Sequence, residues 1–163
     1  MSNNGLEDQA VIIWIYCVVI LCFKMYAVGV YTGIMRFVKK QPAMPEDVSL
    51  MRAEVYEEST NPAVLKGLNM HRNDTENVYI YFFLSLIFPL ATVPGSGTSA
   101  LTAWNCFNLI FTVSRLLYSL CYAFGLQPWR TIVFNVGQIT CVIFGIWSLV
   151  SVFDSVSHYP RFF

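Results

Sequence analysis

Three polar side chains with catalytic potential recur within one otherwise apolar segment of the sequence. Arg115, Tyr118 and Tyr122 stand at positions i, i+3 and i+7, so a helix would present them on one face. In a bilayer a mid-helix guanidinium costs at least ~2.5 kcal/mol, and it therefore needs a partner or an aqueous cavity. This face would offer a guanidinium and two phenols to a ligand or to a neighbouring helix.

A second polar group lies in the run His71-Arg72-Asn73-Asp74-Thr75-Glu76. Arg72 and Glu76 are spaced i and i+4, and Asn73 and Glu76 are spaced i and i+3, so each pair shares a helical face. A third group, Pro128-Trp129-Arg130-Thr131, places a guanidinium at the start of another helix, where the helix dipole adds positive potential.

The three groups together would form a polar pocket for a small ligand that carries several charges. Arginines clamp carboxylates bidentately, a glutamate accepts hydrogen bonds from an ammonium group, and an arginine stabilises an oxyanion or a thiolate. The alternative is a structural ion-pair network, in which Arg72 binds Glu76, or Glu76 binds Arg115. Lys24 likewise either snorkels or pairs with a carboxylate of a neighbouring helix, and an acid such as Asp47 is usually a loop or capping residue.

The elements that must position these groups are four apolar segments, each about long enough to span a bilayer. The chain is 56% hydrophobic and 12% charged, with mean hydropathy +0.54, against roughly 25% charged residues in a soluble domain. We therefore predict an all-α integral membrane protein, a bundle of four transmembrane helices, with no soluble globular domain. The predicted helices cover about residues 10–35, 73–93, 100–124 and 130–153 of a single membrane domain, 1–163.

The basic residues predict the orientation of the chain. Six lysines and arginines lie in the connection 36–72, and Arg130 lies in the connection between the last two helices. Both connections should therefore be cytosolic and both termini lumenal. Glu7 and Asp8 precede the first apolar segment, which is also too long for a secretory signal peptide, so we expect this segment to be retained.

Composition also argues against several other functions. The net charge is zero, so no long-range field attracts nucleic acid, and no basic cluster with a stacking platform is present. The five cysteines fall inside predicted helices and show no CxxC spacing. We expect neither disulfides nor a metal site, and the cysteines should act as small apolar packing residues.

Several of these blocks occur in an order that is typical of one family. They are Lys24-Met25-Tyr26 with Thr32-Gly33 and Arg36, Pro45-Glu46-Asp47, His71-Arg72-Asn73-Asp74-x-Glu76, Arg115 with Tyr122, and Gln127-Pro128-Trp129-Arg130. From Lys24 to about Gln138 the chain resembles the membrane-associated proteins in eicosanoid and glutathione metabolism. Within that family it is similar to the branch that holds microsomal glutathione transferase and microsomal prostaglandin E synthase.

The resemblance implies a homotrimer that binds glutathione between neighbouring subunits near the cytosolic face. The implied membrane is that of the endoplasmic reticulum, with the outer mitochondrial membrane as the alternative. By the same resemblance Arg130 stabilises the glutathione thiolate and Asp47 assists. The implied glutathione ligands are Arg36, Arg72, Asn73, Glu76, Arg115 and Tyr122, and Tyr118 and Thr131 stand at positions of the same site.

The chain departs from the family pattern at a few positions. Tyr118 stands where close relatives have a histidine, Thr131 replaces a serine, and Asn69 replaces an arginine. Phe134 stands where the synthase has a tyrosine, as it does in the transferases. These departures count more against the synthase than against glutathione binding.

We therefore expect a glutathione-dependent transferase that conjugates glutathione to apolar electrophiles, or reduces lipid hydroperoxides, that arrive through the membrane lipids. A thiol with a pKa of about 8.5 is mostly protonated at neutral pH, and a guanidinium such as that of Arg130 would lower this pKa. One alternative is prostaglandin endoperoxide isomerisation, which needs the same thiolate. A noncatalytic binding or scaffold protein is the other main alternative, and a transporter is weaker because no inverted repeat is visible.

Overall fold

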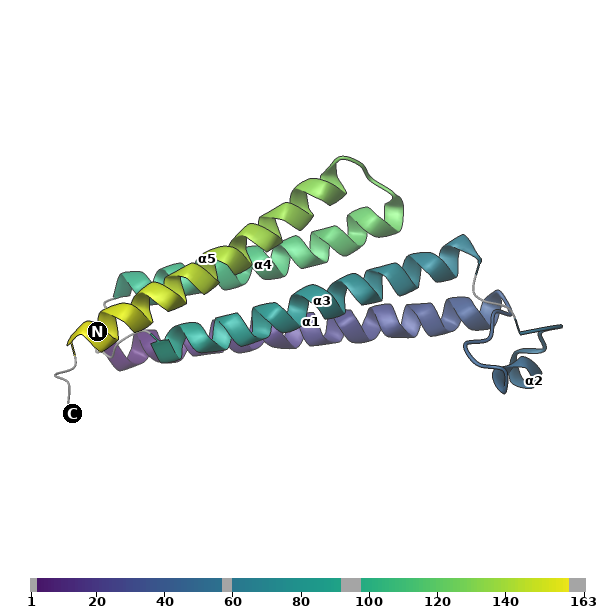
Figure 1. Ribbon diagram of the computed structural model, residues 1–163, viewed down its shortest axis with the longest axis horizontal. Coiled ribbons are helices and arrows are strands. Elements are labelled where there is room, and N and C mark those ends of the chain that lie inside the picture. Colours follow the sequence, from purple (N-terminus) through teal and green to yellow (C-terminus); the bar gives the residue numbers. More distant parts are fainter. Residues whose placement is uncertain (1–2, 57–59, 92–97, 159–163) are drawn as a thin grey trace.

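Four long helices and one short helix make up the computed structural model, which describes residues 3–56, 60–91 and 98–158. The long helices run along the length of the molecule, and α2 lies at the end opposite the N-terminus (Figure 1). Helix α1 packs against α3 and α4, and α5 packs against the same two helices. The elements are α1 (Asn3–Val38), α2 (Asp47–Met51), α3 (Pro62–Ala91), α4 (Thr98–Phe124) and α5 (Trp129–His158).

The predicted all-helical architecture is confirmed over the described residues. Three of the described helices are long and apolar enough to cross a membrane, over Gln9–Val38, Ser99–Phe124 and Trp129–Phe153. The remaining long helix, α3, is apolar in its second half, but its first half carries charged residues that include Lys66, Arg72 and Glu76. Of the three polar groups, the one that contains Arg72 and Glu76 therefore lies on the long helix that is charged along half its length.

Helix α3 begins earlier than the sequence analysis predicted. It starts at Pro62, whereas we expected its start near Asn73. Asn61 caps this end, because its Oδ1 accepts a hydrogen bond from the backbone N–H of Ala63 at 3.0 Å. A proline in the first turn suits a helix, since its missing N–H would have had no helical partner. Apolar length does not reveal this start, because the charged residues between Lys66 and Glu76 separate the short apolar first turn of α3 from its apolar second half.

The connection between the first two long helices is correspondingly shorter than the expected 36–72. Helix α1 continues to Val38, so only residues 39–61 connect it to α3, and they include the short helix α2. Gln41 holds the two ends together. Its Oε1 accepts a hydrogen bond from the backbone N–H of Asn61 at 3.1 Å, and its carbonyl oxygen accepts one from Arg36 Nη1 at 3.5 Å.

Residues 125–128 join α4 to α5 in a tight turn. Gly125 has φ of 70°, the left-handed conformation that glycine adopts without a steric penalty. The N–H of Leu126 bonds the carbonyl of Cys121 at 2.8 Å, and the N–H of Gly125 bonds that of Tyr122 at 3.2 Å. This is the Schellman pattern of helix ends. It places the first turn of α5 directly beside the last turns of α4.

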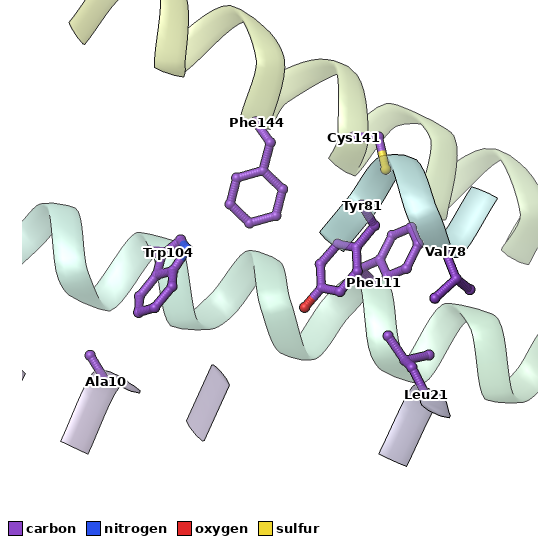
Figure 2. Close-up of a cluster of buried hydrophobic side chains, with 8 residues drawn as sticks. All are labelled: Ala10, Leu21, Val78, Tyr81, Trp104, Phe111, Cys141 and Phe144. Carbon is purple, nitrogen blue, oxygen red and sulfur yellow. The ribbon is translucent and has the colours of Figure 1, made fainter. Parts of the chain in front are cut away.

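The apolar core draws on all four long helices. Figure 2 shows its central cluster, in which Tyr81 of α3 lies against Phe111 of α4. The two rings are stacked, with centroids 4.0 Å apart and an interplanar angle of 7°. The Tyr81 hydroxyl is buried and donates to Asn108 Oδ1 at 2.8 Å. The other members are Ala10, Leu21, Val78, Trp104, Cys141 and Phe144.

Polar contacts also link all four long helices within the bundle. Lys24 of α1 forms an ion pair with Asp74 of α3, and both side chains are buried. This is the pairing with a neighbouring helix that we gave as one explanation of Lys24. Asn77 of α3 accepts a hydrogen bond from Gln138 of α5. Helices in lipid gain little from the hydrophobic effect, so such bonds and close packing hold the bundle together.

We predict that Lys24→Met destabilises the protein by about 3–5 kcal/mol, because it leaves the Asp74 carboxylate buried without its partner. Thermal unfolding of the purified protein in detergent, followed by circular dichroism, measures this loss. Two controls accompany it. Lys24→Met with Asp74→Leu removes both charges and should recover most of the loss, and Lys39→Met, at an exposed lysine, should change little. Equal melting temperatures for Lys24→Met and the wild type would contradict the prediction.

Candidate active site

Arg130 and Tyr122 form the centre of the polar group at the α4–α5 turn. Arg130 is the second residue of α5, and its Cζ lies 5.0 Å from the centroid of the Tyr122 ring. The Tyr122 ring lies in turn 5.8 Å from the Tyr118 ring, measured between centroids. The last turns of α4 therefore present two phenols, and the first turn of α5 lays a guanidinium over one of them.

Gln127 joins Thr131 to Arg130. Asn and Gln amide orientations are assigned from their hydrogen-bond partners. With its nitrogen toward Thr131 Oγ1, at 3.1 Å, the Gln127 amide turns its oxygen toward Arg130, where it accepts a bond from Nε at 3.0 Å. The Arg130 guanidinium is thereby held from one side by Gln127 and from another by the Tyr122 ring. In the sequence Gln127 stands only within a family block, and no local pattern marks its contact with Arg130.

Arg115 lies inside the bundle, with no exposed surface. Its Nη2 donates to the carbonyl oxygen of Phe134 at 3.1 Å, and its Nη1 donates to Asn73 Oδ1 at 3.4 Å. Its Cζ also lies 5.2 Å from the Phe111 ring centroid and 5.3 Å from that of Phe134. The expectation that this charge has a partner is confirmed, and its partners come from α3 and α5 of the same chain.

Gly137 makes room for the Arg115 guanidinium on α5. A Cβ atom at position 137 would lie 2.3 Å from Arg115 Nη2 and 2.8 Å from its Nε. Any other residue there would push the guanidinium away from Phe134 and Asn73. No motif marks this glycine in the sequence, because the requirement comes from a side chain on another helix.

Arg72 and Glu76 form an exposed pair on α3. Arg72 Nε donates to Glu76 Oε1 at 3.0 Å, and the two side chains are 79% and 57% exposed. This is the pairing that we gave as a structural alternative. Within the described parts of the chain, no hydrogen bond or ion pair joins either residue to Arg115 or Arg130. One chain thus presents two separate polar groups, one on α3 and one at the α4–α5 turn.

Asn73 is turned away from that exposed pair. Consecutive residues of a helix point about 100° apart, and Asn73 uses its side-chain oxygen to accept from Arg115. Its carbonyl oxygen accepts a bond from Asn77 Nδ2 at 2.6 Å. Arg115 and Asn73 therefore come together inside the bundle, beside the exposed group rather than within it.

Arg36 and Asp47 lie toward the α2 end of the molecule. Arg36 is in the last turn of α1 and bonds Gln41, and Asp47 is the first residue of α2. Asp47 is not the capping residue, because the N-cap of α2 is Glu46 and forms no side-chain capping bond; the Asp47 carboxylate lies in the first turn, where the helix dipole favours it. In Figure 1, α2 lies beyond α1 and α3, on the side away from α4 and α5. A single chain does not bring Asp47 against the α4–α5 turn.

Lys66 contributes a contact that the sequence analysis did not predict. Its Nζ donates to the carbonyl oxygen of Ala123 at 2.7 Å, so it caps the end of α4 from α3. Cations are favoured at helix C-termini. Among the residues that the structure describes, no three histidine, cysteine, aspartate or glutamate side chains gather as a metal site would require.

The family model of the MAPEG family matches residues 14–150. The chain belongs to the MAPEG family. This match confirms the resemblance drawn from the sequence. Together with the apolar helices, it shows that the chain is an integral membrane protein. Prostaglandin E synthase of Mus musculus is 34% identical over 145 residues, which cover 86% of this chain and 90% of the relative. That of Homo sapiens is 31% identical over 137 residues, covering 83% and 86%, and that of Rattus norvegicus is 33% identical over 131 residues, covering 78% and 81%.

We predict that Gly137→Ala lowers the stability of this MAPEG protein by about 1–3 kcal/mol, because the added methyl group overpacks the space that Arg115 occupies. Gly145→Ala on the same helix is the matched control, since a Cβ there would meet only Leu84, at an ordinary 3.9 Å. Thermal unfolding in detergent compares the two. Equal melting temperatures for the two variants would show that Arg115 does not need the space at Gly137.

Proposed function

We propose that this protein is a glutathione-dependent membrane enzyme that activates the glutathione thiol against an apolar substrate. The observation that carries the proposal is the half-buried Arg130 guanidinium, which lies over Tyr122 and beside Gln127 at the turn between two apolar helices. A cation in that place can meet both a polar ligand from the aqueous side and an apolar substrate from the lipid.

The chemistry of the available side chains fits glutathione. Its two carboxylates suit the guanidinium groups of Arg72 and Arg36, and its ammonium group suits the carboxylate of Glu76. The Arg72–Glu76 pair is exposed, so a ligand can reach both charges. When bound, glutathione supplies the thiol that becomes the nucleophile. Asn73, next to Arg72, would join this side of the site by exchanging its bond to Arg115 for one to the ligand.

Arg130 would stabilise the ionised thiol. A neighbouring guanidinium favours the charged form of a thiol and so lowers its pKa toward neutrality. Tyr122 supports the guanidinium through its ring, Gln127 holds it from the other side, and Tyr118 stands next to Tyr122. Thr131 offers a hydroxyl in the same turn, and Asp47 is proposed as an assisting acid.

We propose that the site is completed between subunits of a homotrimer. In one chain the α3 group, Arg72 and Glu76, is exposed and has no contact with the turn that holds Arg130. A neighbouring copy could bring its own α4–α5 turn against the exposed α3 group. Subunit contact would also bury two charged side chains that a membrane protein otherwise shelters poorly.

The proposed membrane arrangement has four spans, with α3 as the fourth and both termini lumenal in the endoplasmic reticulum. The second half of α3 is charge-free, and the polar first half would lie at the cytosolic side or face neighbouring subunits. Lysines and arginines gather in the connection 39–61 and in the helix ends that adjoin the two connections, and this bias supports the orientation.

Two reactions would use the same thiolate. Conjugation to apolar electrophiles, with reduction of lipid hydroperoxides, is our first proposal, and it is favoured by Phe134 and Tyr118, which stand where the synthase pattern has a tyrosine and a histidine. Isomerisation of a prostaglandin endoperoxide is the second candidate. It is favoured by the relatives above, which carry the name prostaglandin E synthase.

Parallel assays of the purified protein with glutathione would separate these candidates. The three substrates are an aryl halide, a lipid hydroperoxide and a prostaglandin endoperoxide. Turnover of either of the first two, without endoperoxide conversion, supports the transferase and peroxidase proposal. Endoperoxide conversion alone supports the synthase. Glutathione binding without turnover of any of the three supports the noncatalytic alternative.

We predict that Arg130→Leu lowers turnover by roughly 10²-fold or more, the scale of losing one electrostatic stabiliser, and leaves glutathione affinity within a few-fold. The ultraviolet absorbance of the bound thiolate should fall with turnover. Arg72→Ala is the contrasting variant, which should weaken glutathione binding by about 1.5–3 kcal/mol, the size of a lost charged hydrogen bond. Wild-type turnover of all three substrates by an intact Arg130→Leu oligomer would contradict the assignment.

Mixed oligomers test whether the site lies between subunits. In a trimer assembled from Arg72→Ala and Arg130→Leu chains, every mixed ring contains one interface that pairs an unmodified Arg72 with an unmodified Arg130. At glutathione concentrations well below saturation, where Arg72→Ala also lowers the rate, random mixing of equal amounts should therefore restore roughly a quarter of wild-type activity, as cyclic symmetry requires. A site within one chain predicts only the average of the two impaired variants. Oligomers of each variant alone are the controls.

A further inference from the structure

One face of α4 carries a row of buried polar atoms that lack hydrogen-bond partners. Seven such side-chain atoms occur in the described part of the chain, and five of them lie on this one helix. Their positions are spaced by three, four, three and four residues, so they form a single stripe along the helix. We call this stripe the α4 seam. Its members are Asn105, Asn108, Thr112, Arg115 and Ser119.

The middle of the α4 seam, Asn108, Thr112 and Arg115, is buried in the bundle, and Asn105 and Ser119 at its two ends are partly exposed. Asn108 and Arg115 have no exposed surface, and each also makes one or more bonds across the bundle, to Tyr81 in the first case and to Asn73 and Phe134 in the second. Both side chains are therefore already held by one hydrogen-bonding group, while a second group of each has no partner. These second groups are the Asn108 amide nitrogen and the Arg115 Nε. Rotation of these two side chains away from the interior would break the bonds that they make.

A dry interior would not tolerate such a row. Buried polar groups in proteins are almost always bonded, to protein or to ordered water, and a bilayer interior offers no solvent of its own. Bound water typically makes about three hydrogen bonds to otherwise unsatisfied groups. The seam offers donors from an amide and a guanidinium, an amide acceptor at Asn105, and hydroxyls that do both at Thr112 and Ser119. This mixture suits water, which donates and accepts.

The seam also reaches the buried charges. Arg115 is one of its members, and the Asp74 Oδ2 atom, on the carboxylate that pairs with Lys24, is likewise buried and unpartnered. Two cations and one anion thus share the interior of the bundle. Charges at this depth are costly unless they meet partners or water.

We propose that the α4 seam holds a file of bound water molecules that runs through the bundle to the Lys24, Asp74 and Arg115 charges. From Asn105 to Ser119 the file would extend about 21 Å, at 1.5 Å per helical residue. Its role is to hydrate these charges so that Arg115 stays ionised and keeps hold of Asn73. Tyr122, the residue at the next position of the same stripe, lies under Arg130, so the file ends at the α4–α5 turn.

Solid-state NMR of the full-length, isotope-labelled protein in lipid bilayers tests this directly, because magnetisation transferred from water reaches only protein groups in contact with it. Ser114 is the matched reference. It lies on the same helix, is 3% exposed, and its Oγ bonds the carbonyl oxygen of Phe111 at 2.7 Å. We expect the signals of the Asn108 side-chain amide and of the Arg115 Nε–H group, on two residues with no exposed surface, to grow from water several-fold faster than that of Ser114. Equal and slow growth at all three residues would overturn the proposal.

A pair of identical substitutions gives an independent measurement. Ser119→Ala should lower the melting temperature because it removes a site of the water file, whereas Ser114→Ala removes only a bond to its own helix and should change it little. If the seam is dry, Ser119→Ala deletes an unsatisfied hydroxyl and leaves the melting temperature unchanged or higher, which overturns the proposal. Should Ser119→Ala fail to fold, the water-transfer comparison on the unmodified chain decides. Neither measurement depends on catalytic activity.

Discussion

The burial of a guanidinium in the middle of an apolar bundle constrains the rest of this structure. Arg115 has no exposed surface, and a charge at that depth must find compensation from the protein. Asp74 is already bound to Lys24, so Arg115 relies on a carbonyl, an amide oxygen and aromatic faces. These partners come from α3, α4 and α5. Sliding any one of these helices would break a contact that the charge requires.

This constraint extends from the interior to the outer surface. Arg115 holds Asn73, and the residue beside it, Arg72, then points outward with Glu76. On the other side Arg115 holds the carbonyl of Phe134, one helical turn after Arg130. The same guanidinium therefore fixes the rotation of α3 and the depth of α5. The exposed Arg72–Glu76 pair and the half-buried Arg130 group both depend on Arg115, although no charged side chain of either group contacts it.

The sequence predicts part of this arrangement, and there are physical reasons why some features could be predicted and others could not. Apolar length alone located most of the long helices, because about 20 apolar residues have few alternatives to a membrane span. It placed the start of α3 too late, since Asn61 and Pro62 begin a helix that carries charged residues from Lys66 to Glu76, before its apolar half. Spacing alone grouped Arg115 with Tyr118 and Tyr122, because helical geometry is local. The need for glycine at position 137 is set by a side chain of another helix, and no local pattern carries that information.

The two faces of α4 differ in chemistry, since one is polar and the other is apolar. Its inner face carries the polar residues that reach Arg115, and its outer face, with α5, forms an apolar groove of about 390 Å³ lined by residues such as Leu109, Val113 and Val136. Conjugation and endoperoxide isomerisation would require the same thiolate, so counting charges at the α4–α5 turn cannot distinguish them. A site discriminates between substrates through contacts that strengthen in the transition state. In the proposed function, the difference would therefore lie in how an apolar substrate is held against that turn. There Tyr118 and Phe134 pack ring to ring, 5.8 Å apart, between the buried guanidinium and the surface.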